Sequence, residues 1–357
     1  MGLVSRLVKF LFYICSITMI ALVLFELSLH LAYSPDHLLS KRPIICPNRI
    51  WLDDCLISYR KNVRASYTKN IFDKKQLSSF ETNDFGFPVS EPLFSGDKQS
   101  LLVLGDSLVS GEYQNGKAVE LLIKARPDLH LSVMAFPGAN LGTYLAYLEF
   151  YLKTATPELV FVFVSTSDIV GSYYYDSSQP AGLWYVDRKT NTLKLMPADS
   201  RSIWLTLVSK TKIGSLVLTY YNQLYTIFYN GLDHNSVDAP SSRYELYLED
   251  SKIVTSDFIM RLKGLLKDYQ IPEKNVYLVT DMNPGEDTLQ GLWPIFYDIT
   301  SSLSDFEIVK IDLKSSPENV FSDHQHPNGR GHEVIFNAVL HQIDKEAPAG
   351  TKAPDEK

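Results

Sequence analysis

The stretch SLLVLGDS (100–107) sets the fold of this 357-residue chain. Four consecutive apolar residues, Leu101 to Leu104, end in a glycine and are followed by Asp106 and Ser107. A short apolar run of this kind is typical of a strand buried inside a parallel sheet. In an open α/β sheet, reactive side chains gather on the loops at the carboxyl ends of such strands. We therefore predict a buried strand that presents Ser107 at its carboxyl end.

Downstream of this strand, apolar runs alternate with segments of helical spacing. Alternating strands and helices build a parallel sheet with helices on both faces, so we predict an α/β fold. The other expected strands are LHLSVMAF (129–136), ELVFVFVST (158–166), NVYLVT (275–280) and FEIVKI (306–311). The expected helices lie near 114–125, 141–155, 252–268, 288–303 and 329–343.

The alternation breaks between about 171 and 250. Within this interval, GLWYVDRKTNTLKLM (182–196) predicts a hairpin that turns near 189–191, and an apolar helical region follows over 203–229. We interpret the interval as an insertion that packs on the sheet or covers it as a lid. Its aromatic side chains favour a role in the core over a ligand site, because aromatic residues dominate ordinary cores.

The N-terminus carries an uncharged apolar run from Phe10 to Phe25, preceded by Arg6 and Lys9. Such a run suits a signal peptide, and its apolar extension through Tyr33 approaches the roughly 20 residues that span a bilayer. We favour a retained signal-anchor, a single transmembrane helix, because no convincing small-residue cleavage site follows it. The short N-terminus is expected in the cytoplasm, and the body of the protein in the periplasm or at the cell surface.

These patterns divide the chain into four parts. Residues 1–33 are the expected membrane anchor and 34–97 an extracytoplasmic linker region. Residues 98–345 form the expected α/β domain with its insertion. The remaining 346–357 are rich in proline and charge, which predicts a disordered tail.

Composition narrows the class of protein. A net charge of −7 argues against a nucleic-acid-binding face, which would be basic. A mean hydropathy of −0.07 excludes a polytopic membrane protein. Three cysteines rule out a disulfide scaffold. Cys46 and Cys55 could close a small loop in an oxidising compartment or could be two unrelated thiols, and the sequence leaves both open.

Two of the loops that follow predicted strands have the composition of a catalytic site. The first is the Gly-Asp-Ser turn, in which we assign Asp106 to the turn itself and Ser107 to the chemistry. The second is Phe-Pro-Gly-Ala-Asn (136–140), where Gly138 permits a close approach to the backbone.

A third loop, Asp-His-Gln-His-Pro (323–327), precedes the last predicted helix. Its Asp323 and His326 have a spacing that lets the carboxylate orient the imidazole, which is the pair that a serine nucleophile needs. His324 beside His326 invites a metal site, but no carboxylate–histidine spacing elsewhere supports one. We therefore expect no metal here.

With these blocks the sequence resembles the SGNH, or GDSL-type, esterases and acyl-hydrolases. The resemblance covers roughly 98–170 and 305–343. It implies a three-layer fold with a flavodoxin-like parallel sheet, and a reaction that needs no cofactor. A further stretch, Asn-Asp-Phe-Gly-Phe (83–87), is similar to one in bacterial membrane-anchored members. The site residues that the resemblance implies are the nucleophile Ser107, the triad partners Asp323 and His326, and the backbone oxyanion donors Ser107 and Gly138.

One block departs from the family pattern. The family's third block ends in Asn-Asp, and its Asn side chain is the third oxyanion donor, whereas this chain has Ser167 followed by Asp168. A hydroxyl can donate one hydrogen bond but reaches less far than a carboxamide. Either Ser167 serves after a local shift, or the nearby Asn140 replaces it, or the enzyme is slow or specialised.

The expected function is serine-dependent hydrolysis of an ester, of the acyl-esterase or deacetylase type. The expected substrate is an extracytoplasmic small molecule, lipid or glycan. The same acyl-enzyme could instead pass its acyl group to a sugar hydroxyl, which would make the protein a polysaccharide O-acyltransferase. A third alternative is a catalytically weak scaffold or binding protein of an envelope assembly. Protein partners, the acyl group and the oligomeric state are not specified by the sequence.

Overall fold

The computed structural model describes most of the α/β domain and the N-terminal helix. Of the residues singled out above, Cys46, Cys55, Asp323 and His326 lie outside the described residues, as do most of 203–229 and the tail from 347. The described residues are 2–32, 37–38, 56–58, 62, 64–68, 77–87, 92–94, 99–110, 117–169, 173–174, 183–195, 211, 213–214, 241–281, 292–311, 313, 319 and 329–346.

The chain forms two compact units. The first comprises Met1–Arg42, Ala65–Leu77 and Asp199–Val237. The second comprises Pro43–Arg64, Ser78–Ala198 and Asp238–Lys357, and it contains every described residue of the predicted site.

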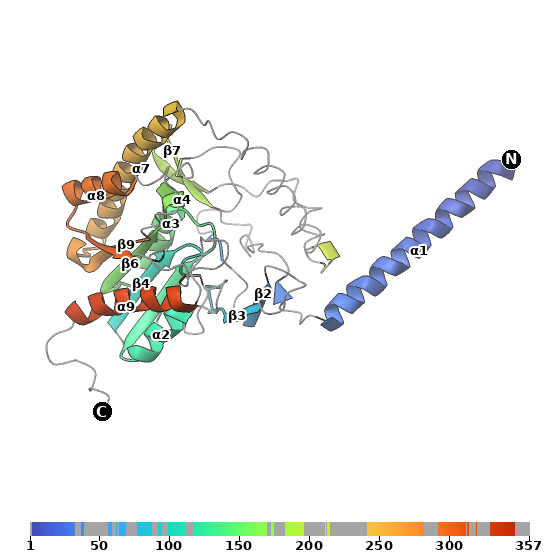
Figure 1. Ribbon diagram of the computed structural model, residues 1–357, viewed down its shortest axis with the longest axis horizontal. Helices are drawn as coiled ribbons and strands as arrows, with labels where there is room; N and C mark the ends of the chain where they lie inside the picture. Colours follow the sequence, from blue (N-terminus) through green and yellow to red (C-terminus); the bar gives the residue numbers. More distant parts are fainter. Residues whose placement is uncertain are drawn as a thin grey trace. The chain divides into compact units, whose positions relative to one another are not determined.

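The second unit is built on a five-stranded sheet in the order β10-β9-β6-β4-β5, and all four pairs of neighbouring strands are parallel. If the five strands are numbered 1 to 5 along the chain, their order from the β5 edge is 2-1-3-4-5, which is the flavodoxin-like arrangement. The predicted α/β class and all five predicted strands are therefore confirmed (Figure 1). The strands are β4 (Gln99–Gly105), β5 (Leu129–Ala135), β6 (Leu159–Val164), β9 (Val276–Asp281) and β10 (Glu307–Ile311).

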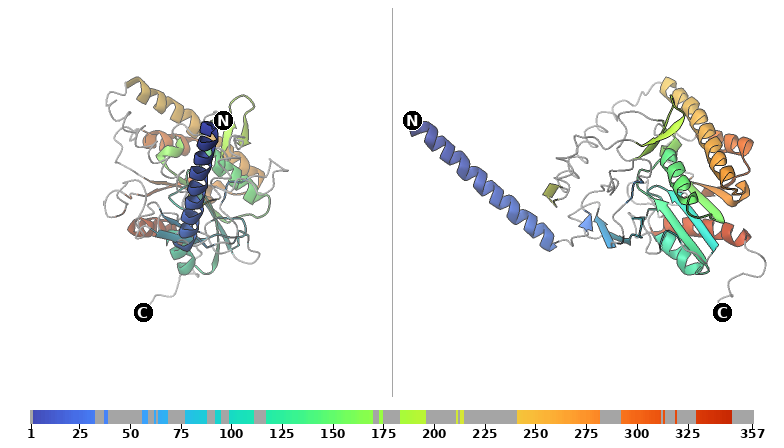
Figure 2. Two further views of the ribbon diagram at one scale, coloured as in Figure 1. Left: turned by 90° about the vertical axis from the view of Figure 1, so that its right-hand side faces the viewer. Right: turned by 180° about the vertical axis from the view of Figure 1, so that it is seen from behind.

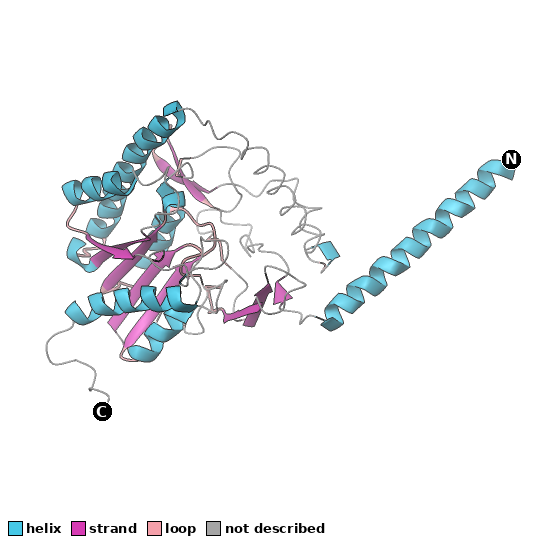
Figure 3. Ribbon diagram, in the orientation of Figure 1, coloured by secondary structure: helices cyan, strands magenta, loops and turns pink. Residues whose placement is uncertain are grey.

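Helices cover both faces of this sheet, as Figure 3 shows by the cyan helices on either side of the magenta strands. One face is covered by α2 (Lys117–Ala125) and α9 (Gly329–Glu346). Alternate strand residues such as Val103 and Phe161 bury against their Leu122 and Ile335. The other layer consists of α3 (Leu141–Leu152), α7 (Ser241–Asp268) and α8 (Leu292–Leu303), with a short 3₁₀ turn, η3 (Glu273–Asn275), before β9.

The inserted segment contains the predicted hairpin, formed by β7 (Trp184–Asp187) and β8 (Thr192–Leu195). Its turn ends at Asn191, whose φ of 55° lies in the left-handed region that asparagine tolerates. The hairpin docks on α3. Figure 2 (right) shows the hairpin beside this helix. Gly142 permits this docking, because a Cβ there would collide with the carbonyl oxygen of Trp184. The amide of Trp184 also donates to Oγ1 of Thr143 at 3.1 Å.

Helix α7 begins at Ser241, about ten residues before the expected start near 252. Its first turns are rich in serine, glutamate and tyrosine, so the apolar periodicity that marks a packed helix begins only later. The sequence also did not predict the short strands β1 (His37–Leu38), β2 (Arg64–Thr68) and β3 (Leu77–Glu81). Unlike the predicted strands, RASYT and LSSFE are mostly polar, and β1 has only two residues, so none of them forms a continuous apolar run.

The stretch 83–87 forms a tight structural loop. The Asn83 Oδ1 accepts hydrogen bonds from the amides of Phe85 and Phe87, both at 3.0 Å, and Gly86 has a φ of 86° that favours glycine. The ring of Phe87 packs edge-on against that of Tyr147 in α3, with centroids 5.2 Å apart. The loop therefore fixes the chain before β4 onto α3.

The first unit contains α1 (Gly2–Ala32), whose apolar side chains are exposed along most of its length. The segment Lys9–Leu31 has a mean hydropathy of 2.3 and no buried portion, so it is long and apolar enough to cross a membrane. Near its end, Glu26 accepts a hydrogen bond from the amide of Ile213 at 2.8 Å. That contact ties the described residues of the 199–237 segment to the helix.

Candidate active site

The turn after β4 presents Ser107. Asp106 builds this turn, because its Oδ1 accepts the amide of Leu108 at 2.9 Å and its carbonyl accepts the amides of Val109 and Ser110 at 3.2 and 3.0 Å. Asp106 is buried, and the assignment of its side chain to the turn is confirmed. Ser107 is half-buried between buried neighbours, so it is the residue of this turn that solvent can reach.

Gly105 closes the strand in front of this turn. A Cβ at this position would lie 2.8 Å from Cγ2 of Val109 and 3.1 Å from Cβ of Phe163. Only glycine lets the turn fold back this closely over β6. Close packing against Val109 and Phe163 therefore explains why the Gly-Asp-Ser block begins with glycine.

The loop after β5 is a β-turn closed by a hydrogen bond from the amide of Ala139 to the carbonyl of Phe136 at 2.9 Å. Proline at the second position and Gly138 with a φ of 76° at the third define a type II turn. The donor of this hydrogen bond is the Ala139 amide, and the Gly138 amide takes no part in it. Gly138 is exposed, and a Cβ there would meet no atom within 4 Å. Glycine is therefore required by backbone conformation and not by space.

The loop after β6 leads into the single turn α4 (Thr166–Ile169). The Oδ2 of Asp168 accepts the amide of Ser165 at 2.8 Å, and the Asp168 amide donates to the Ser165 carbonyl at 3.1 Å. The backbone of Ser167 lies in this turn, while its side chain lies outside the described part of the chain. The role of Ser167 as an oxyanion donor stays a prediction.

The order of the strands brings these three loops together at one edge of the sheet. Gly105 pairs with Ala135 in β5, and Leu104 pairs with Val162 in β6. Because the strands are parallel and β4 lies between β5 and β6, the turn of Ser107 lies between the other two loops. The role of these loops as nucleophile and oxyanion donors stays a prediction.

Two buried side chains at this edge were not predicted as site residues. The hydroxyl of Tyr144, on α3, lies 3.1 Å from Oδ2 of Asp168 and 3.4 Å from the carbonyl oxygen of Ala139. Burial, and next the charge of Asp106, raises the pKa of the Asp168 carboxyl well above its ordinary 3.8. Burial and the charges of Asp168 and Asp106 likewise raise the pKa of the Tyr144 phenol, which therefore keeps its proton.

Asn140 caps the N-terminus of α3. Its Oδ1 accepts the amide of Thr143 at 2.8 Å and the hydroxyl of Thr143 at 2.9 Å, which is the standard bond of an N-cap. The residue is 1% exposed. Its Oδ1 therefore caps the helix. If Asn140 replaces Ser167 as an oxyanion donor, the hydrogen bond must come from its Nδ2 group.

The residues of the third block, Asp323 and His326, lie outside the described part, but the helix that follows them is well defined. Lys345 near the end of α9 pairs with Glu307 at the start of β10 at 3.0 Å, so α9 runs back from the carboxyl edge of the sheet. Its beginning, which directly follows 323–328, therefore lies toward the same edge as Ser107. His332 in this helix is 1% exposed and packs in the interior.

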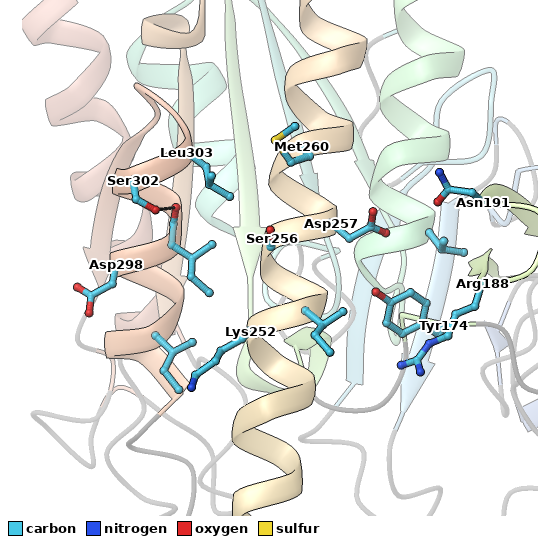
Figure 4. Close-up of a pocket in the computed structure, with 14 residues that line it drawn as sticks. Tyr174, Arg188, Asn191, Lys252, Ser256, Asp257, Met260, Asp298, Ser302 and Leu303 are labelled. Carbon is cyan, nitrogen blue, oxygen red and sulfur yellow. Dashed lines mark hydrogen bonds between the residues drawn. The ribbon is translucent and has the colours of Figure 1, made fainter.

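A separate groove of about 820 Å³ lies between α7, α8 and the β7–β8 hairpin. In Figure 4 the side chains of Lys252, Ser256, Asp257 and Met260 line it from α7, and Arg188 and Asn191 come from the hairpin. The Arg188 guanidinium covers the ring of Tyr174 at 3.9 Å. None of the predicted site residues lines this groove.

Comparisons with known proteins place this chain beside structures of lipolytic enzymes. No family model matches the chain, and no curated protein matches it. One similar solved structure is the psychrotrophic esterase EstA from a Pseudoalteromonas species, at 13% identity over 70% of this chain and 98% of that chain, with a TM-score of 0.38. Another is a lipase/acylhydrolase from Enterococcus faecalis, at 11% identity over 69% and 96%, with a TM-score of 0.39.

A GDSL-like lipase from Bacteroides thetaiotaomicron is also similar, at 11% identity over 72% of this chain and 94% of that chain, with a TM-score of 0.38. At such identities and TM-scores, a function for this chain has to rest on its own residues.

Proposed function

We propose that this protein is a serine hydrolase that cleaves an ester through an acyl-enzyme on Ser107. The observation that carries the proposal is the position of the half-buried Ser107 on a tight turn between the Gly138 loop and the Ser165–Asp168 loop. A nucleophile between two loops that can offer amide donors is the arrangement that acyl transfer needs.

In the proposed reaction, His326 takes the proton of Ser107 as its oxygen attacks the acyl carbon. Asp323 holds the imidazole in the required tautomer and stabilises the imidazolium. The amides of Ser107 and Gly138 donate to the oxyanion, with Ser167 as the third donor. His326 then gives the proton to the leaving alcohol. A water molecule then attacks the acyl-enzyme as His326 takes one of its protons. His326 returns that proton to the oxygen of Ser107 as the acid leaves, which restores both residues.

The placement of His326 in this proposal is supported by the ends of two helices. Arg126, just after α2, binds Asp344 near the end of α9 at 3.0 Å, so the two helices end side by side. Both run back from the carboxyl edge, but α9 is longer, and it starts about six residues, or roughly 9 Å, beyond the start of α2. The start of α9, at Gly329, thus lies on the side of the sheet where the turn of Ser107 lies.

We further propose that α1 anchors the protein and that the catalytic unit lies outside the cytoplasm. Its exposed apolar span supports the anchor. Arg6 and Lys9 before the span are balanced by Lys41 and Arg42 after it, so the orientation rests on the short N-terminus staying in the cytoplasm. An ester-bearing small molecule, lipid or glycan of the envelope would then be the substrate. Protease added to intact spheroplasts should digest the body of the protein, and a fully protected body would show that the orientation is wrong.

The function is tested by measuring acyl release from p-nitrophenyl esters and from acetylated glycans with the full chain in detergent. Ser107→Ala should abolish turnover, and so should His326→Ala. Ser110→Ala is the matched control, because Ser110 lies in the same turn but is fully buried, and it should retain activity. Turnover that persists in Ser107→Ala would refute the proposal, and acyl transfer to an added glycan in place of water would identify an acyltransferase.

A further inference from the structure

The two loops that flank Ser107 are not neighbours in the sheet. They follow β5 and β6, and β4 lies between these strands, so about 10 Å separates them at roughly 4.8 Å per strand. No ladder of backbone hydrogen bonds joins β5 to β6 directly. Their relative position must therefore be set by side chains or by the loops themselves.

Tyr144 spans this gap. It lies on α3, one turn after the Gly138 loop, and its hydroxyl lies 3.4 Å from the carbonyl oxygen of Ala139 and 3.1 Å from Oδ2 of Asp168. The same Oδ2 accepts the amide of Ser165. A continuous set of short contacts therefore runs from one loop, through Tyr144 and Asp168, to the other loop.

The bridge is buried. Tyr144 is 1% exposed and Asp168 is 2% exposed, and Asp106 adds a second carboxyl close by. Burying one carboxyl beside another costs folding free energy. Apolar side chains would fill the same space without this cost. The mechanism proposed above uses neither Tyr144 nor Asp168.

We propose that Tyr144 and Asp168 are positioning residues that hold the Gly138 turn and the Ser165–Ser167 loop at the separation required for one oxyanion hole. This inference rests on the proposed function. Neither side chain touches the substrate. Both act through the backbone amides and side chains of the two loops, so their loss should affect the transition state more than substrate binding.

The test measures kcat and KM for p-nitrophenyl acetate in four variants of the full chain, with rates referred to the folded fraction. Tyr144→Phe should lower kcat about tenfold or more, which is part of the 10²–10³ that a lost oxyanion donor costs, with KM nearly unchanged. Asp168→Ala should behave alike. Asp168→Asn should stay close to wild type, because its carboxamide oxygen can accept the same two hydrogen bonds.

Tyr147→Phe is the matched control. Tyr147 lies on the same helix, is fully buried, and donates to the carbonyl of Ile57 at 2.6 Å, away from both loops. It should lower the melting temperature to a similar extent as Tyr144→Phe and leave kcat unchanged.

Equal kcat values for the two phenylalanine variants would overturn the proposal, and so would an Asp168→Asn variant as slow as Asp168→Ala. If Tyr144→Phe does not fold, the comparison of the two Asp168 variants decides. Turnover that does not depend on Ser107 would overturn the proposed function and this inference together. Serine-dependent turnover that is insensitive to the bridge would overturn this inference alone.

Discussion

Arg126 joins the ends of two helices that are distant in sequence, since its Nη1 lies 3.0 Å from Oδ1 of Asp344 across 218 residues. The same guanidinium binds both oxygens of Asp128, at 2.9 and 2.7 Å. The Arg126 side chain is 8% exposed, whereas both carboxylates are more than half exposed. Arg126 therefore holds the end of α9 against the end of α2.

Arg126→Ala should lower the free energy of unfolding by about 1–3 kcal/mol, because the change removes a bidentate pair and the packing of a buried stem. Urea unfolding measures this loss. Lys345→Ala is the control at the same end of α9, since its pair with Glu307 is largely exposed and should cost about 0–1 kcal/mol. Equal losses in the two variants would contradict a special role for Arg126.

Gly138→Ala should destabilise the protein by about 1–2 kcal/mol, because a φ of 76° disfavours any residue with a Cβ. Space is not the cause, since a Cβ there would meet nothing within 4 Å. Gly264→Ala in α7 has the same free space without the positive φ, so it should stabilise the protein by about 0.5–1 kcal/mol. Thermal unfolding of both variants checks the two signs, and a destabilising Gly264→Ala would show that the reasoning is wrong.

Asp168 makes stability depend on pH. Its pKa is raised in the folded protein, so above pH 3.8 the unfolded chain releases this proton first and the contribution of Asp168 to stability falls as pH rises. Asp168→Asn removes the titration. The stability of wild type relative to Asp168→Asn should therefore fall from pH 4 upward until the folded carboxyl ionises. Chemical unfolding of both proteins across this range tests the sign, and a relative stability that rises with pH would contradict it.

Ser167 occupies the position where the resembled family has asparagine. If it is a working donor, Ser167→Ala should lower kcat, and Ser167→Asn should raise it by restoring the longer donor. If the substrate fills the space of an asparagine, Ser167→Asn should instead raise KM alone. When neither change alters either constant, Ser167 is a bystander and Asn140 is the next residue to test.

Asn140→Ala should in any case destabilise the protein by about 1 kcal/mol, because the N-cap of α3 is lost. Asn140→Ser can restore the cap without restoring a carboxamide donor. A fall in kcat that persists in Asn140→Ser would therefore assign an oxyanion role to Asn140, while full recovery of kcat would exclude it. Steady-state kinetics and thermal unfolding of the two variants separate these results.

The sheet and its hairpin could be predicted because their signals are local. Each strand is a continuous apolar run, as in ELVFVFVST, and the hairpin turn has a residue that tolerates a positive φ. The Tyr144–Asp168 bridge could not be predicted, because Tyr144 has the spacing of an ordinary core aromatic. Only the strand order β6-β4-β5 shows that its hydroxyl spans two loops that lie far apart in sequence.

Labelling of the full chain with a fluorophosphonate, followed by location of the adduct by mass spectrometry, tests whether Ser107 is an activated nucleophile. A fluorophosphonate reacts with a serine whose hydroxyl is activated by a neighbouring base. We expect one adduct on Ser107 that is lost in His326→Ala and kept in Ser110→Ala. No adduct on Ser107, or an adduct that forms equally fast in His326→Ala, would contradict this expectation.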